Sequence, residues 1–473
     1  MDLLIKNKNF SLQNIDEETG LGLVYSEEYQ KCLFLDPLAT ALWNLSDPID
    51  PSQAKKLAIE QIGAEITEDF FEETLSHMCE WGLLIPVSMA AQQKDPQPRY
   101  LVQEEKEPLL QHIYFYSTME CNARCYHCYQ PTTKVADAAK FPNANQVSND
   151  KFLKLAEAAL PLGLQNVKIT GGEPFLRRDT AELVQDLGGM GVHVSLETNG
   201  SLITDEIAAV LAKERITVAI SLDGATEETH DTYRRLPGSY RKALNALRII
   251  SSKGGKPKVI ISVSRRNLAE LEDIIRVAKA NGSGFVKINP VSTIGLGKKL
   301  KDTGYLLSIE EVLMLCHQRL ELEKRHGVVV FMEVPPAFSS VAEIAMGRIG
   351  ICPFTNIIGI LEDGSISFCG IGNTHPELIL GNINDNNFSL EQFWGESQGL
   401  VDVRHLLRQD LQGVCSICVH KPYCKGSCRA LAFDEFGSFI APHAWCQKAY
   451  DKGLFPVQYL IQKREQNLSG EIF

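Results

Sequence analysis

The strongest constraint on the fold is a regular alternation of strand and helix patterns that runs from about residue 110 to residue 335. Runs rich in Val and Ile are each followed by an amphipathic stretch, and this order is typical of a parallel sheet whose strands are joined by helices. The predicted strands are 112–118, 167–170, 192–198, 216–222, 258–264 and 285–291. Six such units fall short of the eight in a complete barrel. The pattern therefore predicts an α/β fold with a partial (β/α)6 barrel and its chemistry at the carboxyl ends of the strands.

The first part of the chain, residues 1–95, is predicted to be a small α+β domain. Strand patterns at 20–26 and 31–37 form a pair joined by a short polar turn. Three helical patterns follow, and the last of them, 67–85, opens with Thr67 as an N-cap residue.

Three further boundaries follow from composition. Residues 96–110 are polar and contain proline, which predicts a linker before the barrel at 111–340. Residues 341–450 have short elements and many cysteines, and they predict a small domain held together by metal rather than by apolar volume. Residues 451–473 are expected to form a helix with a polar end.

Cysteine usage narrows the function. The chain has 13 cysteines, and most of them fall in two groups, at 121–128 and 352–446. Because the N-terminus lacks the pattern of a secretory signal, we expect a cytoplasmic, reducing environment, in which clustered cysteines indicate metal binding or catalysis rather than disulfides. The net charge of −12 argues against a general nucleic-acid binder. No apolar run reaches the length of about 18 residues that a membrane span needs.

The first cysteine group, CNARCYHC, follows the first predicted strand directly and has the spacing C-x3-C-x2-C. Its members are Cys121, Cys125 and Cys128. Zinc usually takes four ligands, and a fourth is not obvious locally, although His127 is adjacent. Three thiolates on a four-iron cluster instead leave one iron open to a small molecule. Three unrelated buried thiols are the weakest interpretation, because the intervening residues are not typical of a core.

The run CNARCYHCY resembles the cluster loop of radical S-adenosylmethionine enzymes. Further motifs of that family match in order: VKITGGEP at 167–174, ETNG at 197–200, ISLDG at 220–224 and an arginine within THDTYRR. The resemblance implies a 4Fe–4S cluster on the three cysteines, with S-adenosylmethionine bound to its open iron. The residues that it assigns to this cofactor are Gly171, Gly172, Glu173, Pro174, Glu197, Asn199, Ser221, Asp223 and Arg234.

Two of these assignments have structural alternatives. A glycine pair after a strand is also an ordinary tight turn, and Arg234 beside Arg235 has the alternative of a solvated surface residue. The resemblance implies that Glu173 orients the methionine amine of the cofactor, either directly or through backbone geometry. It also implies that one electron from the reduced cluster would cleave the cofactor to a 5′-deoxyadenosyl radical, which would abstract hydrogen from a substrate C–H bond.

The second cysteine group resembles the SPASM extension of peptide-modifying radical enzymes, which carries two auxiliary 4Fe–4S clusters. By position, the ligands of an outer cluster would be Cys415, Cys418, Cys424 and Cys446, and those of an inner cluster, nearer the barrel, would be Cys352, Cys369 and Cys428. The inner cluster then lacks a fourth cysteine, so either another group completes it or one iron is open to a substrate thiolate. The C-x2-C and C-x3-C spacings also suit zinc, and the barrel motifs upstream favour iron–sulfur.

Residues 1–95 resemble the winged-helix-like domain that recognises precursor peptides of ribosomally made natural products. Such a domain binds an extended leader peptide as an added strand. A small helical domain with only a packing role is the alternative.

Together these resemblances imply a maturase that installs a thioether or carbon–carbon cross-link in a precursor peptide, with flavodoxin or ferredoxin as electron donor and no nucleic-acid or membrane partner. Epimerisation, decarboxylation or backbone excision of a peptide are alternatives, and so is a non-catalytic metal-bearing protein that binds a peptide. No catalytic acid or base is predicted, because Gly370 follows Cys369 where some relatives carry an aspartate.

Overall fold

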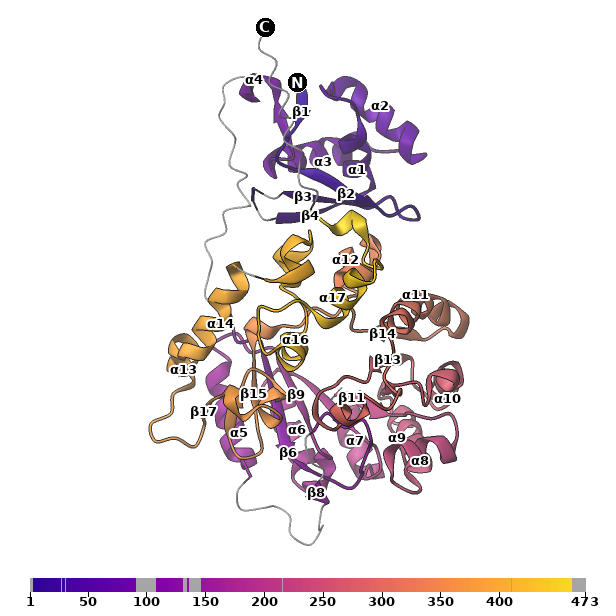
Figure 1. Ribbon diagram of the computed structural model, residues 1–473, viewed down its shortest axis with the longest axis vertical. Coiled ribbons are helices and arrows are strands. Elements are labelled where there is room, and N and C mark those ends of the chain that lie inside the picture. Colours follow the sequence, from indigo (N-terminus) through magenta and orange to yellow (C-terminus); the bar gives the residue numbers. More distant parts are fainter. Residues whose placement is uncertain are drawn as a thin grey trace.

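The structure is a computed structural model that describes residues 3–26, 28–29, 31–90, 108–130, 134–135, 146–214, 216–409 and 411–461. Figure 1 shows an elongated molecule in which the N-terminal unit lies at one end, next to the cysteine-rich C-terminal segments, and the α/β unit forms the other end. Residues 96–107 of the predicted linker and 462–473 of the predicted tail lie outside the described residues. None of the described helices is long and apolar enough to cross a membrane.

The centre of the α/β unit is a ten-stranded sheet with the order β14-β13-β12-β11-β10-β9-β6-β15-β16-β17. Its strands are β6 His112–Thr118, β9 Asn166–Gly171, β10 His193–Thr198, β11 Thr217–Ser221, β12 Lys258–Val263, β13 Phe285–Pro290, β14 Val329–Met332, β15 Ile357–Ile360, β16 Ser365–Ser367 and β17 Ile379–Asn382. The strands from β14 to β15 in this order are parallel. β16 pairs with β15 in the antiparallel sense, and β17 pairs with β16 in the same way. All six strands predicted from the sequence are confirmed, and β14 and β15 extend the parallel part beyond the prediction.

Helices lie between most of the parallel strands along the chain. They are α5 Asn149–Ala159, α6 Thr180–Gly189, α7 Asp205–Lys213, α8 Glu227–Arg234, α9 Ser239–Ser252, α10 Leu271–Ala280 and α11 Ile309–His326. The hydroxyls of Ser148, Thr204 and Ser308 cap α5, α7 and α11 by accepting a backbone N–H of the first turn. These caps explain why each helix begins directly after its polar loop.

Side chains along the barrel strands alternate between two environments, as the period of a strand requires. Val167 and Ile169 of β9 are fully buried in the main apolar core, whereas Lys168 between them is partly accessible on the opposite face. We call this second, polar face of the parallel strands the lumen of the partial barrel.

The cysteine-rich region differs from the prediction of a domain held together by metal rather than by apolar volume. β15 pairs with β6, with Ile358 opposite Ile113, and thus joins the barrel sheet. Phe354, Ile360 and Trp394 belong to the same apolar core as the barrel strands. The prediction is wrong on this point, because the region contributes strands and buried apolar side chains to the barrel core. Its helices are α12 Val341–Ala345, α13 Leu390–Glu396, α14 Gln398–Gln409, α15 Lys421–Cys424, α16 Arg429–Phe436 and α17 Ala444–Asp451.

The N-terminal unit has its own apolar core and combines a three-stranded antiparallel sheet, three main helices and a strand pair. Its elements are β1 Leu4–Lys6, β2 Ser11–Ile15, β3 Gly22–Ser26, β4 Lys31–Leu35, α1 Pro37–Asn44, α2 Pro51–Ile62, α3 Glu68–Glu80, β5 Leu84–Pro86 and α4 Val87–Ala90. The predicted strand pair and the Thr67 cap are confirmed, since the Thr67 hydroxyl accepts the N–H of Phe70. The predicted helix over 67–85 is too long, because α3 ends at Glu80 and β5 then pairs with β1.

The N-terminal sheet packs against the cysteine-rich segments (Figure 1). The amide of Asn14 in β2 donates to the Tyr459 hydroxyl at 2.9 Å. The ring of Phe34 in β4 contacts the ring of Tyr423 edge-on, with 5.9 Å between the centroids. The unit that the sequence assigns to peptide recognition therefore contacts the segment that carries the second cysteine group.

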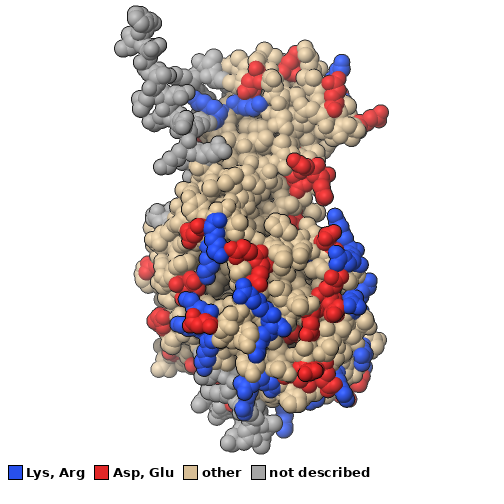
Figure 2. Space-filling view, turned by 45° about the vertical axis from the view of Figure 1, so that its right-hand side comes forward, with Lys and Arg blue, Asp and Glu red and all other residues tan. Residues whose placement is uncertain are grey.

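Charged side chains of both signs are interspersed on the face shown in Figure 2. The described part of that face therefore has no continuous basic surface of the kind that nucleic-acid binding requires.

Candidate active site

The loop after β6 carries the first cysteine group. Cys121 ends the two-residue strand β7 (Glu120–Cys121), which pairs with β8 (Lys134–Val135), and Cys125 and Cys128 follow Cys121 in the loop. The N–H of Arg124 donates to the carbonyl of Arg234 at 3.2 Å, which joins the loop to the end of α8. The three cysteines thus follow the carboxyl end of a parallel strand, where active sites of such sheets are found.

The three thiols are poorly suited to ionise on their own. Burial raises the pKa of Cys121 to about 12 and that of Cys128 to about 11, and it raises the pKa of Cys125 as well. The guanidinium of Arg234 acts in the opposite direction on the pKa of all three. Since metals bind the thiolate, a positive centre such as a cluster has to supply the remaining stabilisation.

Arg234 is a buried residue, with only 8% of its surface exposed, so the alternative of a solvated surface arginine is wrong. Its Nη1 lies 3.2 Å from Oδ2 of Asp223, whose Oδ1 accepts the N–H of Ser262 at 2.7 Å. Burial acts to lower the pKa of Arg234, but Cys125 and Asp223 outweigh this effect and raise it. Nε of Arg234 is buried and has no hydrogen-bond partner among the described residues, so a polar ligand beside the cluster loop would satisfy it.

The GGEP motif at the end of β9 brings two backbone segments into close contact. Gly171 has a φ of +134°, and a Cβ there would lie 2.2 Å from the carbonyl oxygen of Thr118. A Cβ at Gly172 would lie 2.0 Å from the carbonyl oxygen of Glu120. The pair is therefore more than an ordinary turn, because only glycine lets the end of β9 approach the cluster loop so closely.

The carboxylate of Glu173 is fully buried and accepts hydrogen bonds from within the protein. It accepts the Thr198 hydroxyl at 2.7 Å, the N–H of Asn199 at 2.8 Å and the N–H of Phe175 at 3.2 Å. Burial raises the pKa of Glu173, and these three donors act in the opposite direction. Glu173 thus joins the GGEP motif to the ETNG motif, and Pro174 then begins a short 3-10 turn.

Two further motif residues link neighbouring strand ends. Nδ2 of Asn199 donates to Oδ1 of Asn122 in the cluster loop at 2.8 Å. The hydroxyl of Ser221, the last residue of β11, donates to the carbonyl of Thr198 at 3.3 Å. The ends of β9, β10 and β11 and the cluster loop are therefore one connected hydrogen-bonded structure.

Glu197 differs from the other motif residues because it faces the lumen. Its carboxylate lies 2.5 Å from Nζ of Lys168, and Lys287 of β13 forms a matching pair with Glu333 at 2.7 Å. Burial acts to raise the pKa of Glu197, but Lys168 and Lys287 outweigh this effect and lower it. Lys168, Lys287 and Glu333 were not predicted as site residues. Lys168 and Lys287 alternate with buried apolar residues along β9 and β13, and Glu333 directly follows β14.

Two buried polar residues near the third cysteine were also not predicted as site residues. His127 stacks on Tyr233 with 4.6 Å between the ring centroids, and its Nε2 lies 3.7 Å from Asp223. Burial lowers the pKa of His127 to about 4. Nδ1 of His127 and both amide atoms of Gln130 have no partner among the described residues. Buried polar groups without partners are rare, so these atoms fit a site for a polar ligand.

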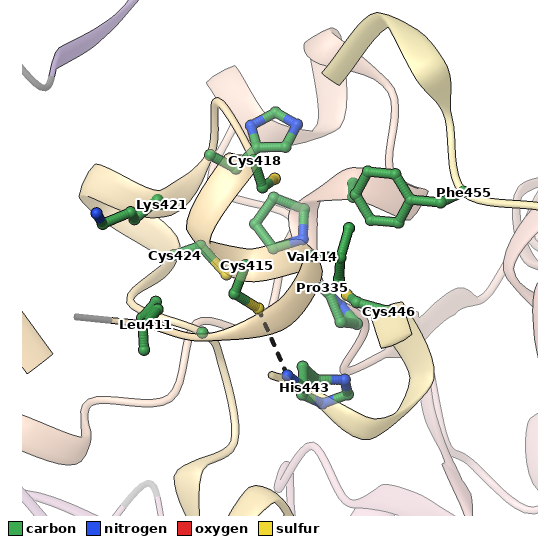
Figure 3. Close-up of a pocket in the computed structure, with 14 residues that line it drawn as sticks. Pro335, Leu411, Val414, Cys415, Cys418, Lys421, Cys424, His443, Cys446 and Phe455 are labelled. Atoms are coloured by element: carbon green, nitrogen blue, oxygen red, sulfur yellow. Dashed lines mark hydrogen bonds between the residues drawn. The ribbon is translucent and has the colours of Figure 1, made fainter. Parts of the chain in front are cut away.

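Four members of the second cysteine group surround one pocket (Figure 3). They are Cys415, Cys418, Cys424 and Cys446. Burial raises the pKa of all four thiols. The N–H of His443 donates to Sγ of Cys415 at 3.5 Å, which is the dashed line in Figure 3.

The other three members of this group lie within electrostatic reach of one another. Cys352 interacts with Cys428 and Cys369, and Cys369 interacts with Cys428. A Cβ at Gly370 would lie 2.2 Å from the phenol oxygen of Tyr116, so this phenol fills the space next to Cys369. Burial raises the pKa of Tyr116 well above its ordinary value, so the phenol is protonated at neutral pH.

The charge around the second cysteine group fits anionic clusters. Arg429 is 0% exposed, and its titratable neighbours include the thiols of Cys415, Cys424, Cys428 and Cys352. A buried cation needs a counter-ion, which thiolate-bound clusters would supply. Among the described residues, no three His, Cys, Asp or Glu side chains are arranged to hold a single metal ion. The ligands of a 4Fe–4S cluster bind different iron atoms, so they do not have to converge on one point.

Comparisons with known proteins agree on the barrel. Residues 115–278 match the sequence profile of the Radical SAM superfamily. An AdoMet-dependent heme synthase from Methanosarcina barkeri is 25% identical over 346 residues, which are 70% of this chain and 94% of the relative. A mycofactocin maturase from Mycobacterium ulcerans is 26% identical over 337 residues, which are 70% of this chain and 86% of the relative.

One solved structure, of Streptococcus suis SuiB bound to precursor peptide SuiA, extends the likeness of the fold. Its TM-score is 0.58 at 13% identity, and the match covers 94% of this chain and 100% of that chain. The family implies S-adenosylmethionine and a 4Fe–4S cluster, and the chemistry of the cluster loop fits both. The chain therefore contains a radical SAM domain and is an enzyme.

Proposed function

We propose that this enzyme is a maturase that installs a cross-link, either a thioether or a carbon–carbon bond, in a ribosomally synthesised precursor peptide. The observation that carries the proposal is the contact of the N-terminal unit with the cysteine-rich segments, through Asn14 to Tyr459 and Phe34 to Tyr423. An enzyme that acts on one residue of a long peptide gains affinity and selectivity by binding a second segment of the same peptide elsewhere.

At the first site, Cys121, Cys125 and Cys128 would hold a 4Fe–4S cluster with one open iron. When bound and reduced, for example by flavodoxin or ferredoxin, the cluster and S-adenosylmethionine supply a 5′-deoxyadenosyl radical that abstracts hydrogen. Arg234, held by Asp223 beside the three thiols, would bind the carboxylate of the cofactor.

Other residues would complete this site from the neighbouring strand ends. The backbone of Gly171 to Pro174 would bind the cofactor amine, because the Glu173 carboxylate is already used by three internal donors. Asn199 and Ser221 would keep β10 and β11 in register with the cluster loop. Glu197 would contact the cofactor only from the lumen, where the Glu197 carboxylate is paired with Lys168.

In the cysteine-rich region we propose two auxiliary 4Fe–4S clusters. The outer one would be held by Cys415, Cys418, Cys424 and Cys446, and the inner one by Cys352, Cys369 and Cys428. The pocket of Figure 3 supports the outer assignment, and the buried charge of Arg429 supports both. Because the inner set has three cysteines, one iron would be open to a substrate thiolate, and this favours thioether formation.

The lumen charges limit what the reacting residue can be. Lys168 is paired with Glu197 and Lys287 with Glu333, so the four charges neutralise one another. A charged substrate side chain would have to compete for one partner and leave the other unpaired, which is costly. An uncharged polar side chain fits this lumen, and the protonated phenol of Tyr116 would donate a hydrogen bond beside Cys369.

The N-terminal unit would bind the leader segment. A groove at the ends of its helices is lined by residues that follow β4, including Leu38, and by the α2–α3 connection and Phe70, which is 47% exposed. In the similar fold of SuiB, the solved complex contains precursor peptide SuiA.

The heme synthase relatives represent another substrate class. The relative from Methanosarcina barkeri matches 70% of this chain over 94% of its own length, so this chain has a part without a counterpart in that relative. The SuiB match covers 94% of the chain, and this broader coverage favours a peptide substrate. Epimerisation, decarboxylation and backbone excision remain the alternative outcomes on a peptide.

Co-expression of the enzyme with candidate short peptides encoded near its gene, followed by mass analysis of each peptide, tests the reaction. A cross-link is expected as the loss of two hydrogens, and peptide fragmentation should fail between the joined residues. An unchanged mass would indicate epimerisation, and the loss of carbon dioxide would indicate decarboxylation. The Cys121→Ala variant should leave the peptide unmodified, while release of unmodified peptide by the wild type together with no 5′-deoxyadenosine would refute the proposal.

Leader binding is tested by changing the groove. Phe70→Asp should weaken binding of the same peptide at least tenfold without changing cleavage of S-adenosylmethionine. Leu57→Asp is the matched control, because Leu57 of α2 is 42% exposed but does not line the groove. Equal affinities of the two variants would argue against this groove.

A further inference from the structure

Arg429 lies in the interior of the cysteine-rich region without an acidic partner. Its side chain is 0% exposed, and its titratable neighbours include four cysteines and His443. Nη1 donates to the carbonyls of Phe439 at 2.9 Å and Ala441 at 2.6 Å, and Nη2 donates to that of Gly426. Nε has no partner among the described residues. A buried, unpaired guanidinium is one of the costliest groups in a folded protein, so a function has to retain it.

The chain between Cys424 and Cys428 is shaped around this guanidinium. All three residues of that loop have positive φ angles, of +48°, +76° and +55°. A Cβ at Gly426, the middle residue, would lie 2.4 Å from Cζ of Arg429. Positive φ strains the two residues of this loop that are not glycine, and such strain persists only where the surroundings hold it. The loop is therefore built to hold the guanidinium between two cysteines of different sets.

The cysteine neighbours of Arg429 come from both sets. Cys415 and Cys424 belong to the outer set, and Cys352 and Cys428 belong to the inner set. One fixed positive charge thus acts on both proposed cluster sites.

We propose that Arg429 is the shared counter-charge of the two auxiliary clusters and raises the reduction potential of both. The inference rests on the proposed function, because it requires both clusters. An added electron makes a cluster more negative, and a fixed cation in a low-dielectric interior stabilises that reduced form. Since one guanidinium neighbours both sets, its removal should lower the reduction potentials of both clusters together. Removal of a hydrogen-bond donor to one cluster would change the potential of that cluster alone.

The test is a redox titration followed by electron paramagnetic resonance on the anaerobically reconstituted full chain. In R429M, the ratio of reduced to oxidised cluster at a fixed potential should fall at least tenfold for both auxiliary clusters, which is about 59 mV for a one-electron couple. R429K retains the charge and should shift both ratios clearly less. In cluster-free protein, R429M should raise the thermal midpoint of unfolding, because the substitution removes an uncompensated buried cation.

R319M is the matched control, because Arg319 is also buried but is paired with Glu343. It should lower the thermal midpoint with and without clusters and leave both potentials unchanged. Unchanged potentials in R429M, a shift of one cluster alone, or equal shifts in R429K and R429M would overturn the inference. Iron content and spectra that show a single cluster in the wild type would instead overturn the two-cluster proposal itself, so the two failures are distinguishable.

Discussion

Replacing Glu173 tests whether the GGEP motif acts through its side chain or through its backbone. Both carboxylate oxygens are already used, since Oε1 accepts Thr198 and Phe175 and Oε2 accepts Asn199. In Glu173→Ala these buried donors lose their acceptor. We therefore expect the motif backbone to loosen, and the affinity for S-adenosylmethionine to fall as a consequence.

The magnitude follows from the hydrogen bonds. A bond to a charged group contributes about 1.5–3 kcal/mol, so the two shortest bonds to Glu173 correspond to roughly 3–6 kcal/mol of local stability. Loss of the bond at the Asn199 amide alone should raise its hydrogen-exchange rate roughly ten- to hundredfold. Because burial raises the pKa of Glu173, removing the charge offsets part of the loss. Glu173→Gln keeps the volume and one acceptor, so it should lose roughly 1–3 kcal/mol.

The assay combines hydrogen exchange of segments 171–176 and 198–200 with calorimetric titration of S-adenosylmethionine into the reconstituted enzyme. Both exchange and dissociation constant should increase in the order wild type, Glu173→Gln, Glu173→Ala. Glu182→Ala is the control, because Glu182 lies exposed on α6 and should change neither quantity. Weaker binding with unchanged exchange would mean that Glu173 contacts the cofactor directly, and the backbone explanation would be wrong.

Three further predictions follow from single contacts. Gly172→Ala should abolish S-adenosylmethionine binding, because the added Cβ would lie 2.0 Å from the carbonyl oxygen of Glu120. Gly189→Ala is the control: its added Cβ would have no atom within 4 Å, so binding should stay unchanged and α6 should be stabilised by about 0.4–1 kcal/mol. Burial lowers the pKa of His230 from 6.5 to about 4, so the unfolded chain binds a proton that the folded chain does not. Stability should therefore fall as the pH decreases from 6.5 to about 4, by roughly 3 kcal/mol in all, and urea unfolding of H230N should lack this part of the pH dependence. Thr67→Ala should lower the thermal midpoint of the N-terminal unit through a loss of about 1 kcal/mol at the cap of α3, while cleavage of S-adenosylmethionine stays unchanged. Binding by Gly172→Ala, an unaltered pH profile in H230N or an unchanged midpoint in Thr67→Ala would each contradict the contact in question.

The strands could be predicted because a parallel strand is a local pattern. In β9 and β10, buried apolar residues alternate with polar ones, and helix caps such as Thr204 mark where the next element begins. The cysteine spacing is equally local, since a cluster loop needs its ligands within a few residues of one another. These features depend on residues that are near in the chain, and the sequence therefore predicts them.

The pairing across the lumen could not be predicted in this way. Lys168 and Glu197 meet because β9 and β10 are neighbours, and Lys287 meets Glu333 because β14 joins β13. The sequence likewise shows that Gly370 is not an acid, but not that the phenol of Tyr116 occupies the adjoining space. Such contacts depend on which strands become neighbours, and residue spacing does not contain that information.

Local patterns in the sequence are enough to predict the partial barrel, the two cysteine groups and the order of the radical SAM motifs, because each rests on short-range periodicity or on the spacing of ligands. Only the folded chain shows that the Glu173 carboxylate accepts hydrogen bonds from within the protein and that Arg234 and Arg429 are buried beside cysteines. Burial and charge pairing arise from segments far apart in the chain, which the sheet and the packed core bring into contact.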